Sequence, residues 1–195
     1  MKIVLATSNK HKVQEINDIV RSLGLNIEFI LPPGDFDPVE DGKNFEENSY
    51  IKAHEAWKLA KTWVLADDSG LCIDALGGKP GIFSARYAET PALRIERVLK
   101  EMEGFTERNA HFTCAMTLIN PEGKVEYKYQ GICEGSIINE SKGTNGFGYD
   151  PIFLVKGDTR TMAELSEDEK NQISHRSVAL RHVLKYLEKL TNAIS

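Results

Sequence analysis

Cysteine is scarce in this chain, and the cysteines that it has are far apart. They are Cys72, Cys114 and Cys133, an odd number with no C-x-x-C pair among them. The spacings that are usual for a structural zinc site are therefore missing. We expect reduced thiols that are mostly buried, as is typical of proteins in a reducing compartment.

Long apolar runs are also lacking. The N-terminus has one lysine before the apolar residues Ile3 to Ala6, a run that is too short for a signal peptide. No stretch approaches the roughly 18 apolar residues that a membrane-spanning helix needs. These features predict a cytoplasmic protein with no membrane partner.

Positive charge is not in excess either. The 195 residues carry a formal net charge of -5, which is unfavourable for wrapping a nucleic-acid backbone. We therefore expect no nucleic-acid partner, although an acidic chain can still hold a local basic pocket for a small anion. The sequence also lacks repeats and long linkers, and the chain length fits a single domain, 1–195, with two lobes.

Strand and helix patterns alternate in the first third of the chain. The continuously apolar stretch 2–7 is typical of a buried strand, and helical spacing follows over 10–23 up to Gly24. The next predicted elements are a strand over 25–29, a helix over about 44–61 and a strand over 63–66 that ends at Asp67. This order predicts an α/β fold.

The middle of the chain has the pattern of a long antiparallel hairpin. Apolar residues alternate over 110–118 and 125–129, and the turn sequence Asn120-Pro121-Glu122-Gly123 lies between them. The remaining predicted elements are a helix from Thr90-Pro91 to Gly104, a short strand over 152–155, a short helix capped by Ser166 and Glu169, and a final helix from about Ser174. A hairpin added to parallel strands predicts a mixed sheet, with a cleft where the strand ends release their loops.

A polar and basic stretch, Thr7-Ser8-Asn9-Lys10-His11-Lys12, separates the first strand from the first helix. Helices usually have acidic residues in the first turn, so basic side chains at this end reverse the usual order. The free backbone N–H groups at a helix start also attract anions. A solvated loop is the simpler alternative, but the combined features favour a phosphate site. It is not a Walker loop, because the chain has no G-x-x-x-x-G-K-[ST].

Two adjacent carboxylates, Asp67 and Asp68, follow the predicted buried strand. They repel each other, and a cap or a turn would explain only one of them. Carboxylate oxygens combined with phosphates are the ligands that magnesium prefers. Glu40 or Asp41, at the end of the polar loop before the second helix, is a candidate for a further metal ligand.

The second predicted helix carries Asn48 and Lys52 on one face, at the spacing that makes side chains neighbours. An exposed lysine on a solvated face is the ordinary alternative for Lys52. A role beside bound phosphates is the functional interpretation.

The stretch Gly143-Thr144-Asn145-Gly146-Phe147-Gly148-Tyr149-Asp150-Pro151 places two aromatic rings among glycines. Such rings can present a flat face to a planar base, although a surface turn with buried aromatics has the same composition. Ser174-His175-Arg176 starts the last helix with two basic residues, and Lys170 lies just upstream. Together with the carboxylates and the first basic stretch, these clusters predict a site for a magnesium nucleotide.

Five motifs, in order along the chain, resemble the inosine triphosphate pyrophosphatase family. They are TSNKHK, ADDSGL, ALGGKPGIFSARY, GTNGFGYDPIF and ISHR, and the resemblance runs from Lys2 to about Leu187. The family hydrolyses non-standard purine nucleoside triphosphates such as dITP and XTP. The resemblance implies a two-lobed α/β fold, built on a long mixed sheet with flanking helices and a central cleft. It also implies Mg²⁺, a homodimer and release of pyrophosphate by cleavage between the α and β phosphorus atoms.

The resemblance also assigns roles to residues of this chain. Asp68 matches the catalytic base and metal ligand, Glu40 the loop acid that binds metal, and Lys52 a helix position facing the phosphates that we place in catalysis. The implied substrate-binding residues are Thr7, Ser8, Asn9, Lys10, His11, Lys12 and Asn48, with Ser69 beside Asp68, and Phe147, Gly148, Tyr149, Asp150, Lys170, His175 and Arg176 for the base.

These assignments predict in-line attack of water on the α-phosphorus of dITP, ITP or XTP, with Lys10, Lys12 and Lys52 stabilising the pyrophosphate leaving group. The cellular result would be a nucleotide pool cleared of bases that must not enter DNA or RNA. Two other classes of function remain as alternatives. One is a nucleotide-binding regulatory module without turnover, and the other is a metal-dependent nucleotide-sugar transferase, whose Asp-x-Asp spacing this chain lacks at Asp67-Asp68.

Overall fold

The computed structural model describes residues 1–194, apart from the side chains of His11, Glu15, Ala193 and Ile194. The chain divides into two compact units. Unit 1 consists of Met1–Asp68, Ala115–Gln130 and the C-terminal segment from Ala179, and unit 2 consists of Ser69–Cys114 and Gly131–Val178.

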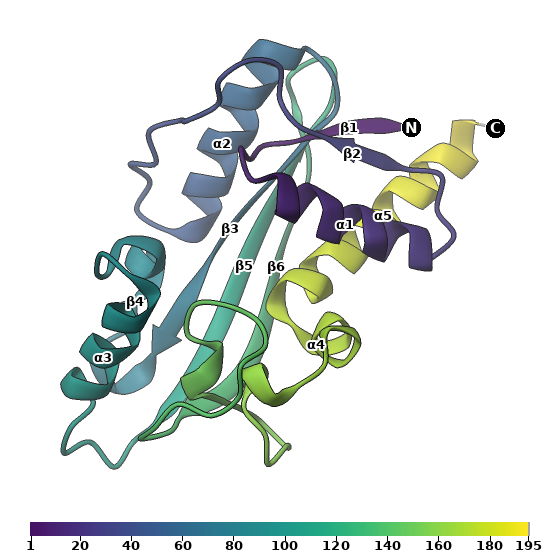
Figure 1. Cartoon of the computed structure of the whole chain (residues 1–195). Coiled ribbons are helices and arrows are strands. Elements are labelled where there is room, and N and C mark those ends of the chain that lie inside the picture. Colours follow the sequence, from purple (N-terminus) through teal and green to yellow (C-terminus); the bar gives the residue numbers. More distant parts are fainter. Residues whose placement is uncertain (195) are drawn as a thin grey trace. The chain divides into compact units, whose positions relative to one another are not determined.

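Strands and α-helices alternate from β1 to β3, whereas β5, β6 and β7 follow one another before the last two helices (Figure 1). The strands are β1 (Lys2–Leu5), β2 (Glu28–Ile30), β3 (Val64–Ile73), β4 (Lys79–Pro80), β5 (Asn109–Ile119), β6 (Val125–Ile137) and β7 (Phe153–Val155). The α-helices are α1 (Lys10–Ser22), α2 (Phe45–Ala60), α3 (Pro91–Glu101), α4 (Glu167–Ile173) and α5 (His175–Ile194). Short 3₁₀ turns are η1 (Asp74–Leu76), η2 (Gly81–Arg86), η3 (Asp150–Ile152) and η4 (Met162–Glu164).

The strands form one sheet in the order β2-β1-β3-β5-β6-β7, and β4 pairs with β3. Strand β1 is parallel to both β2 and β3, whereas the β3–β4 and β6–β7 pairs are antiparallel. The predicted α/β fold with a long mixed sheet and flanking helices is therefore confirmed. The central cleft between two lobes stays a prediction.

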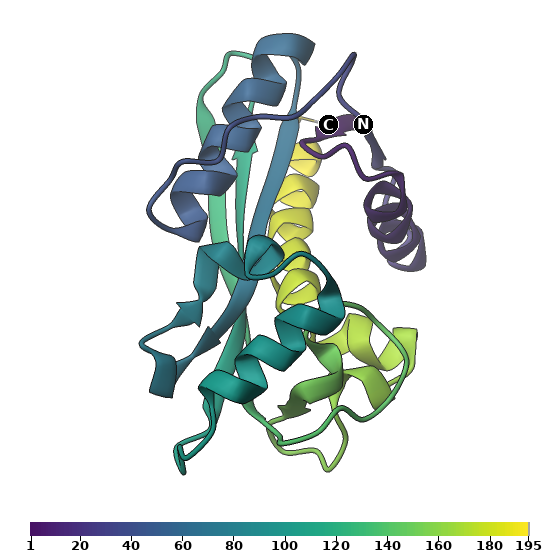
Figure 2. The same cartoon turned by 60° about the vertical axis from the view of Figure 1, so that its left-hand side comes forward.

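Unit 1 has helices on both faces of its strands. Figure 2 shows α2 and the C-terminal part of α5 on opposite sides of β3, β5 and β6. Helix α2 turns small residues toward the sheet: Ala53 and Ala56 are buried against Val4 and Ala66. The Ser49 hydroxyl meets the Thr117 hydroxyl of β5 at 2.7 Å, so this buried polar pair is satisfied.

Unit 2 has its own apolar core, which includes the second half of β3. Leu71 and Ile73 are fully buried there with Val98 and Met102 from the region of α3, and with Phe153 of β7. Helix α3 starts where the sequence predicts, with Thr90 as N-cap and a proline in the first turn. Each unit therefore has an apolar core of its own.

One predicted boundary is wrong. Strand β3 does not end at Asp67 but continues through Asp68 and Gly70 to Ile73. The reason is that Leu71 and Ile73 supply further buried residues and that Cys72 pairs with Pro80 of β4. The sequence pattern did not predict this extension, because Asp67 and Asp68 interrupt the apolar run from which the strand was predicted.

Other predictions from local signals are confirmed or shifted by a few residues. Strand β2 starts three residues later than expected, at Glu28, and β6 runs on to Ile137. The capping box of Ser166 and Glu169 at the start of α4 is present. Cys72, Cys114 and Cys133 form no disulfide, and only Cys72 of the three is not fully buried. Within residues 1–194, no helix is both long and apolar enough to cross a membrane.

Candidate active site

Asp67 and Asp68 of β3 each face a different lysine. Successive side chains of a strand point to opposite faces, which separates the two adjacent carboxylates. Asp67 Oδ1 lies 2.5 Å from Lys12 Nζ of α1, and the Asp67 side chain is almost fully buried. Asp68 Oδ1 lies 3.3 Å from Lys52 Nζ of α2. The repulsion expected between neighbouring carboxylates is therefore relieved by one cation on each side of the strand.

Lys52 joins Asp68 to the loop acid Glu40. Its Nζ lies 3.2 Å from Glu40 Oε2 as well as 3.3 Å from Asp68 Oδ1, and the side chain is 13% exposed. Burial alone would lower the pKa of Lys52, but the carboxylates of Asp67, Asp68 and Glu40 outweigh it and raise the pKa above its usual value. Lys52 is therefore a charged ammonium held between two carboxylates. The alternative of an exposed lysine on a solvated helix face is therefore wrong for Lys52.

Asp68 keeps one carboxylate oxygen available. Within the described part of the chain, Oδ2 is buried and has no hydrogen-bond partner. Burial raises the pKa of Asp68, while Lys52 and the Asn48 amide act in the opposite direction without cancelling the rise. A buried oxygen without a donor is costly unless something binds it. Asp68 is thus disposed to accept a proton or to bind a cation.

Asn48 holds the loop that carries Glu40. Its side chain is 1% exposed, and its Oδ1 accepts a 2.8 Å hydrogen bond from the N–H of Gly42. A Cβ at Gly42 would lie 2.5 Å from Asn48 Oδ1 and 2.9 Å from the Asn48 backbone nitrogen, so only glycine fits there. In the structure the carbonyl oxygen of the Asn48 side chain holds the loop of Glu40, and a contact of Asn48 with phosphates stays a prediction. No sequence pattern indicates the contact between Asn48 and Gly42, because it depends on how the loop folds back on α2.

Replacing Asn48 by Ala should loosen the Glu40 loop. Loss of the acceptor of the half-buried Gly42 N–H should cost about 1 kcal/mol, and we expect the Mg²⁺ concentration at half-maximal activity to rise about fivefold. The measurement is a Mg²⁺ titration of pyrophosphate release. Asn44→Ala is the matched control, because the Asn44 side chain caps α2 by accepting the Glu47 N–H and donating to the Glu47 carboxylate. That variant should lower the melting temperature without changing the Mg²⁺ dependence, and equal Mg²⁺ dependence in all three proteins would rule out the positioning role.

The basic stretch 7–12 lies at the start of α1, as predicted. Asn9 Oδ1 accepts the Lys12 N–H at 3.4 Å, and Thr7 Oγ1 accepts the Asn9 N–H at 3.1 Å. Ser8 and Lys10 are exposed, while Lys12 reaches Asp67. The side chain of His11 lies outside the described residues. The helix start thus combines its positive dipole with polar and basic side chains, the arrangement that favours a bound phosphate.

In unit 2, Phe147 presents an exposed ring beside two cations. The residue is 61% exposed, with Lys170 Nζ 4.5 Å and Arg176 Cζ 5.8 Å from the ring centroid. Below the ring, buried Asp150 accepts both the Phe147 N–H (2.9 Å) and Lys170 Nζ (2.5 Å) on Oδ2. Asp150 therefore fixes the loop and Lys170 together. An exposed aromatic face with adjacent cations is suited to stacking a base and donating to its edge.

The glycine loop needs Gly146 for a steric reason. Gly146 has φ +72°, and a Cβ there would lie 2.1 Å from Asp150 Oδ2 and 3.0 Å from Lys170 Nζ. A side chain at this position would therefore break the Asp150–Lys170 contact. This explains why the chain places glycine beside the exposed ring.

Besides Asp150, two more of the expected base-binding residues are buried, Tyr149 and His175. The hydroxyl of Tyr149 donates to the Ser84 carbonyl at 2.8 Å, and burial raises the pKa of Tyr149 to about 12. His175 stacks on Phe112, with ring centroids 4.9 Å apart. In this structure Tyr149 and His175 therefore support the loop and the start of α5, and Phe147 is the more accessible ring. Ser84 lies in the motif ALGGKPGIFSARY and had no predicted role; it also accepts the Leu71 N–H of β3.

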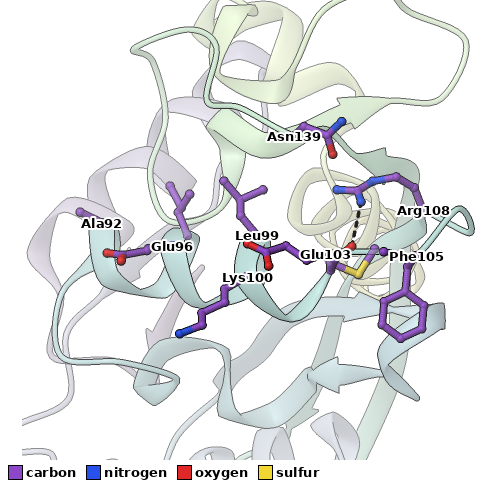
Figure 3. Close-up of a pocket in the computed structure, with 11 residues that line it drawn as sticks. Ala92, Glu96, Leu99, Lys100, Glu103, Phe105, Arg108 and Asn139 are labelled. Atoms are coloured by element: carbon purple, nitrogen blue, oxygen red, sulfur yellow. Dashed lines mark hydrogen bonds between the residues drawn. The ribbon is translucent and has the colours of Figure 1, made fainter.

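A hollow of about 800 Å³ lies elsewhere in unit 2, along α3 (Figure 3). Its lining includes Ile95, Leu99, Phe105 and Asn139, and no predicted site residue. The guanidinium of Arg108, which lines the hollow, donates to the carbonyls of Met102 and Ile137. This cation therefore connects two backbone segments. The hollow therefore offers no chemistry comparable with that of the two clusters above.

Comparison with known proteins gives one consistent result. The model of the Ham1 family matches residues 3–186. A Bacillus subtilis protein named dITP/XTP pyrophosphatase is 44% identical over 191 residues, covering 95% of this chain and 96% of its own length. A Synechococcus protein of the same name is 43% identical over 188 residues, covering 96% of this chain and 90% of its own length.

Solved structures give the same picture. The Ham1 protein of Coxiella burnetii has a TM-score of 0.88 at 42% identity, and the Ham1 protein of Staphylococcus aureus has a TM-score of 0.87 at 39% identity. Both alignments cover 97% of this chain and 99% of the other chain. The similarity thus extends over the whole fold, including every strand and helix that carries the candidate residues.

Proposed function

The chain belongs to the Ham1 family, and we propose that it hydrolyses the non-standard purine nucleoside triphosphates dITP, ITP and XTP to the monophosphate and pyrophosphate. Full-length relatives that are named dITP/XTP pyrophosphatase support this reaction. The observation that carries it is the cluster of Glu40, Lys52 and Asp68, in which Asp68 Oδ2 is buried without a hydrogen-bond partner among the described residues. The enzyme would clear these nucleotides from the pool and keep their bases out of DNA and RNA.

We assign the triphosphate to residues of unit 1. The start of α1 supplies Thr7, Ser8, Asn9, Lys10, His11 and Lys12, and α2 supplies Lys52. Lys10, Lys12 and Lys52 would neutralise the charge that develops on the departing pyrophosphate. Asp68 would hold the attacking water and accept its proton. Ser69, the next residue of β3 and the first of unit 2, would be a further substrate contact.

We also propose Mg²⁺ as the metal, with Glu40 and Asp68 as ligands. Both carboxylates lie within 3.3 Å of one ammonium nitrogen, so they converge on one point. Among the described residues no group of three or more His, Cys, Asp or Glu side chains could hold a metal alone. Two carboxylates completed by phosphate oxygens and water are the usual ligand set of Mg²⁺, so the donor set fits. When bound, the metal supplies charge neutralisation on the phosphates.

We assign the purine base to unit 2. Phe147 would stack on the base, Arg176 and Lys170 would donate to its edge, and Gly146 and Gly148 would let the loop approach closely. Asp150, Tyr149 and His175 would hold these groups in position through their buried contacts. Donors at the edge favour the 6-oxo group of a purine over the 6-amino group of adenine.

Further proposals follow from the composition and from the family resemblance. We propose a cytoplasmic homodimer in which residues 1–195 act as a single two-lobed domain, with no nucleic-acid or membrane partner. The acidic net charge of -5 and the cysteines without disulfides are consistent with this location and these partners.

One assay tests the proposed function. The protein is incubated with dITP, ITP, XTP, GTP or ATP in the presence of Mg²⁺, and pyrophosphate and orthophosphate are measured separately. We expect pyrophosphate from the first three substrates and at most about 10⁻² of that rate from ATP. Binding without turnover would instead indicate a regulatory module, and transfer to a sugar phosphate a nucleotide-sugar transferase.

A further inference from the structure

The ammonium of Lys52 lies where both proposed metal ligands converge. Its Nζ is within 3.3 Å of Glu40 Oε2 and of Asp68 Oδ1. From this geometry we propose that Lys52 takes the place of the cation in the nucleotide-free protein, so that a divalent metal binds only together with the nucleotide. The proposal rests on the assignment of Glu40 and Asp68 as metal ligands under the proposed function.

The physical reason is competition for the same oxygens. An ammonium and a divalent cation repel each other strongly at the distances that two shared carboxylates impose. A metal that enters alone must therefore displace Lys52, whose side chain is only 13% exposed. The displaced ammonium would then be partly buried without an anion, which is unfavourable.

A nucleotide removes this obstacle. Its phosphates are anions that can accept the displaced ammonium, and the four-carbon stem of lysine is flexible enough to move between partners. Glu40 and Asp68 would then be released to hold the metal, and Asp68 Oδ2 has no competing hydrogen-bond partner among the described residues. Asp67 does not offer the ammonium an alternative, because it already lies 2.5 Å from Lys12. The exchange of Lys52 from carboxylates to phosphates thus links metal binding to substrate binding.

Mn²⁺ without nucleotide is the direct probe. Its binding to the full chain can be measured by electron paramagnetic resonance and by the shift of the melting temperature that it causes. For Lys52→Met we expect one Mn²⁺ per chain, bound at least tenfold more tightly than by the wild type. Mn²⁺ should also raise the melting temperature of this variant more than that of the wild type.

Lys128→Met is the matched control. It makes the same substitution in another ion pair of unit 1, between Lys128 Nζ and Glu46 Oε1 at 2.8 Å, and should leave Mn²⁺ affinity at the wild-type level. Glu40→Gln added to Lys52→Met should remove most of the gained affinity. If Lys52→Met does not fold, Lys52→Gln serves the same comparison, because it also lacks the charge but keeps a polar end.

Equal Mn²⁺ affinity in the wild type and in the folded Lys52 variant would overturn the proposal, and so would an equal gain in Lys128→Met. These outcomes are independent of turnover. A wild type that releases no pyrophosphate from dITP would contradict the proposed function, whereas tighter Mn²⁺ binding by the Lys52 variant would still support the cation exchange.

Discussion

Asp68→Asn should lower the rate of pyrophosphate release from dITP by about 10²–10⁴-fold, the range lost with a positioned general base, while the chain stays folded. Asparagine has nearly the shape of aspartate but can neither accept a proton from water nor bind a metal ion as an anion. Asp68 lies in mid-strand, with its backbone held in β3, so the substitution should leave the sheet intact. The measurements are kcat under saturating Mg²⁺ and the melting temperature.

Asp67→Asn is the control that the chain itself offers. It changes the neighbouring residue in the same way, but Asp67 is paired with Lys12 on the opposite side of the strand. Losing that buried charge pair should lower the melting temperature more than Asp68→Asn does. Asp67 also contributes to the raised pKa of Lys52, so Asp67→Asn should lower turnover as well. We expect this decrease to be smaller than that caused by Asp68→Asn.

The raised pKa of Asp68 predicts how turnover depends on pH. Burial raises the pKa of Asp68 above that of an exposed aspartate, which makes its carboxylate a better proton acceptor. Turnover should therefore fall as the pH drops through this raised pKa, because the protonated acid cannot act as a base. If a folded Asp68→Asn protein turned over dITP at the wild-type rate, Asp68 would have no part in the mechanism.

The elements that the sequence predicts well are those with local signals. Thr90 and Pro91 mark the start of α3, and Ser166 with Glu169 marks the start of α4, because a cap and its partner lie within four residues. The β5–β6 hairpin follows from strict alternation around a turn sequence. Such signals depend on the segment alone, so the predictions made from them do not require knowledge of tertiary contacts.

Features that depend on distant segments could not be predicted. That β3 continues past Asp67 is decided by its pairing with β4 and by burial in unit 2. Likewise, the sequence identifies Lys12, Asp67 and Lys52 as candidates but not which lysine serves which carboxylate, because that depends on the face to which each strand residue points. Buried supporting roles, such as that of Asn48, depend on loop folding in the same way.

Arg176→Ala should narrow the preference for ITP over ATP, whereas Phe147→Ala should weaken both substrates alike. The 6-oxo group of hypoxanthine accepts hydrogen bonds from a guanidinium. The 6-amino group of adenine is itself a donor, so the guanidinium would be left without an acceptor. Each such unmet contact costs about 1–3 kcal/mol, more for a charged donor, so removing Arg176 should reduce the ITP:ATP ratio of kcat/KM by at least tenfold.

Stacking gives the contrasting result, because every base has a π-face. Phe147 is exposed, and Lys170 and Arg176 lie beside its ring. Its loss should cost about 1–3 kcal/mol of binding for each nucleotide and leave their ratio unchanged. The measurement is kcat/KM for ITP, XTP, GTP and ATP in both variants and the wild type. If Arg176→Ala reduced all four substrates by one common factor, Arg176 would act on the phosphates, and the discrimination between 6-oxo and 6-amino purines would have to come from Lys170 or from backbone N–H groups of the loop.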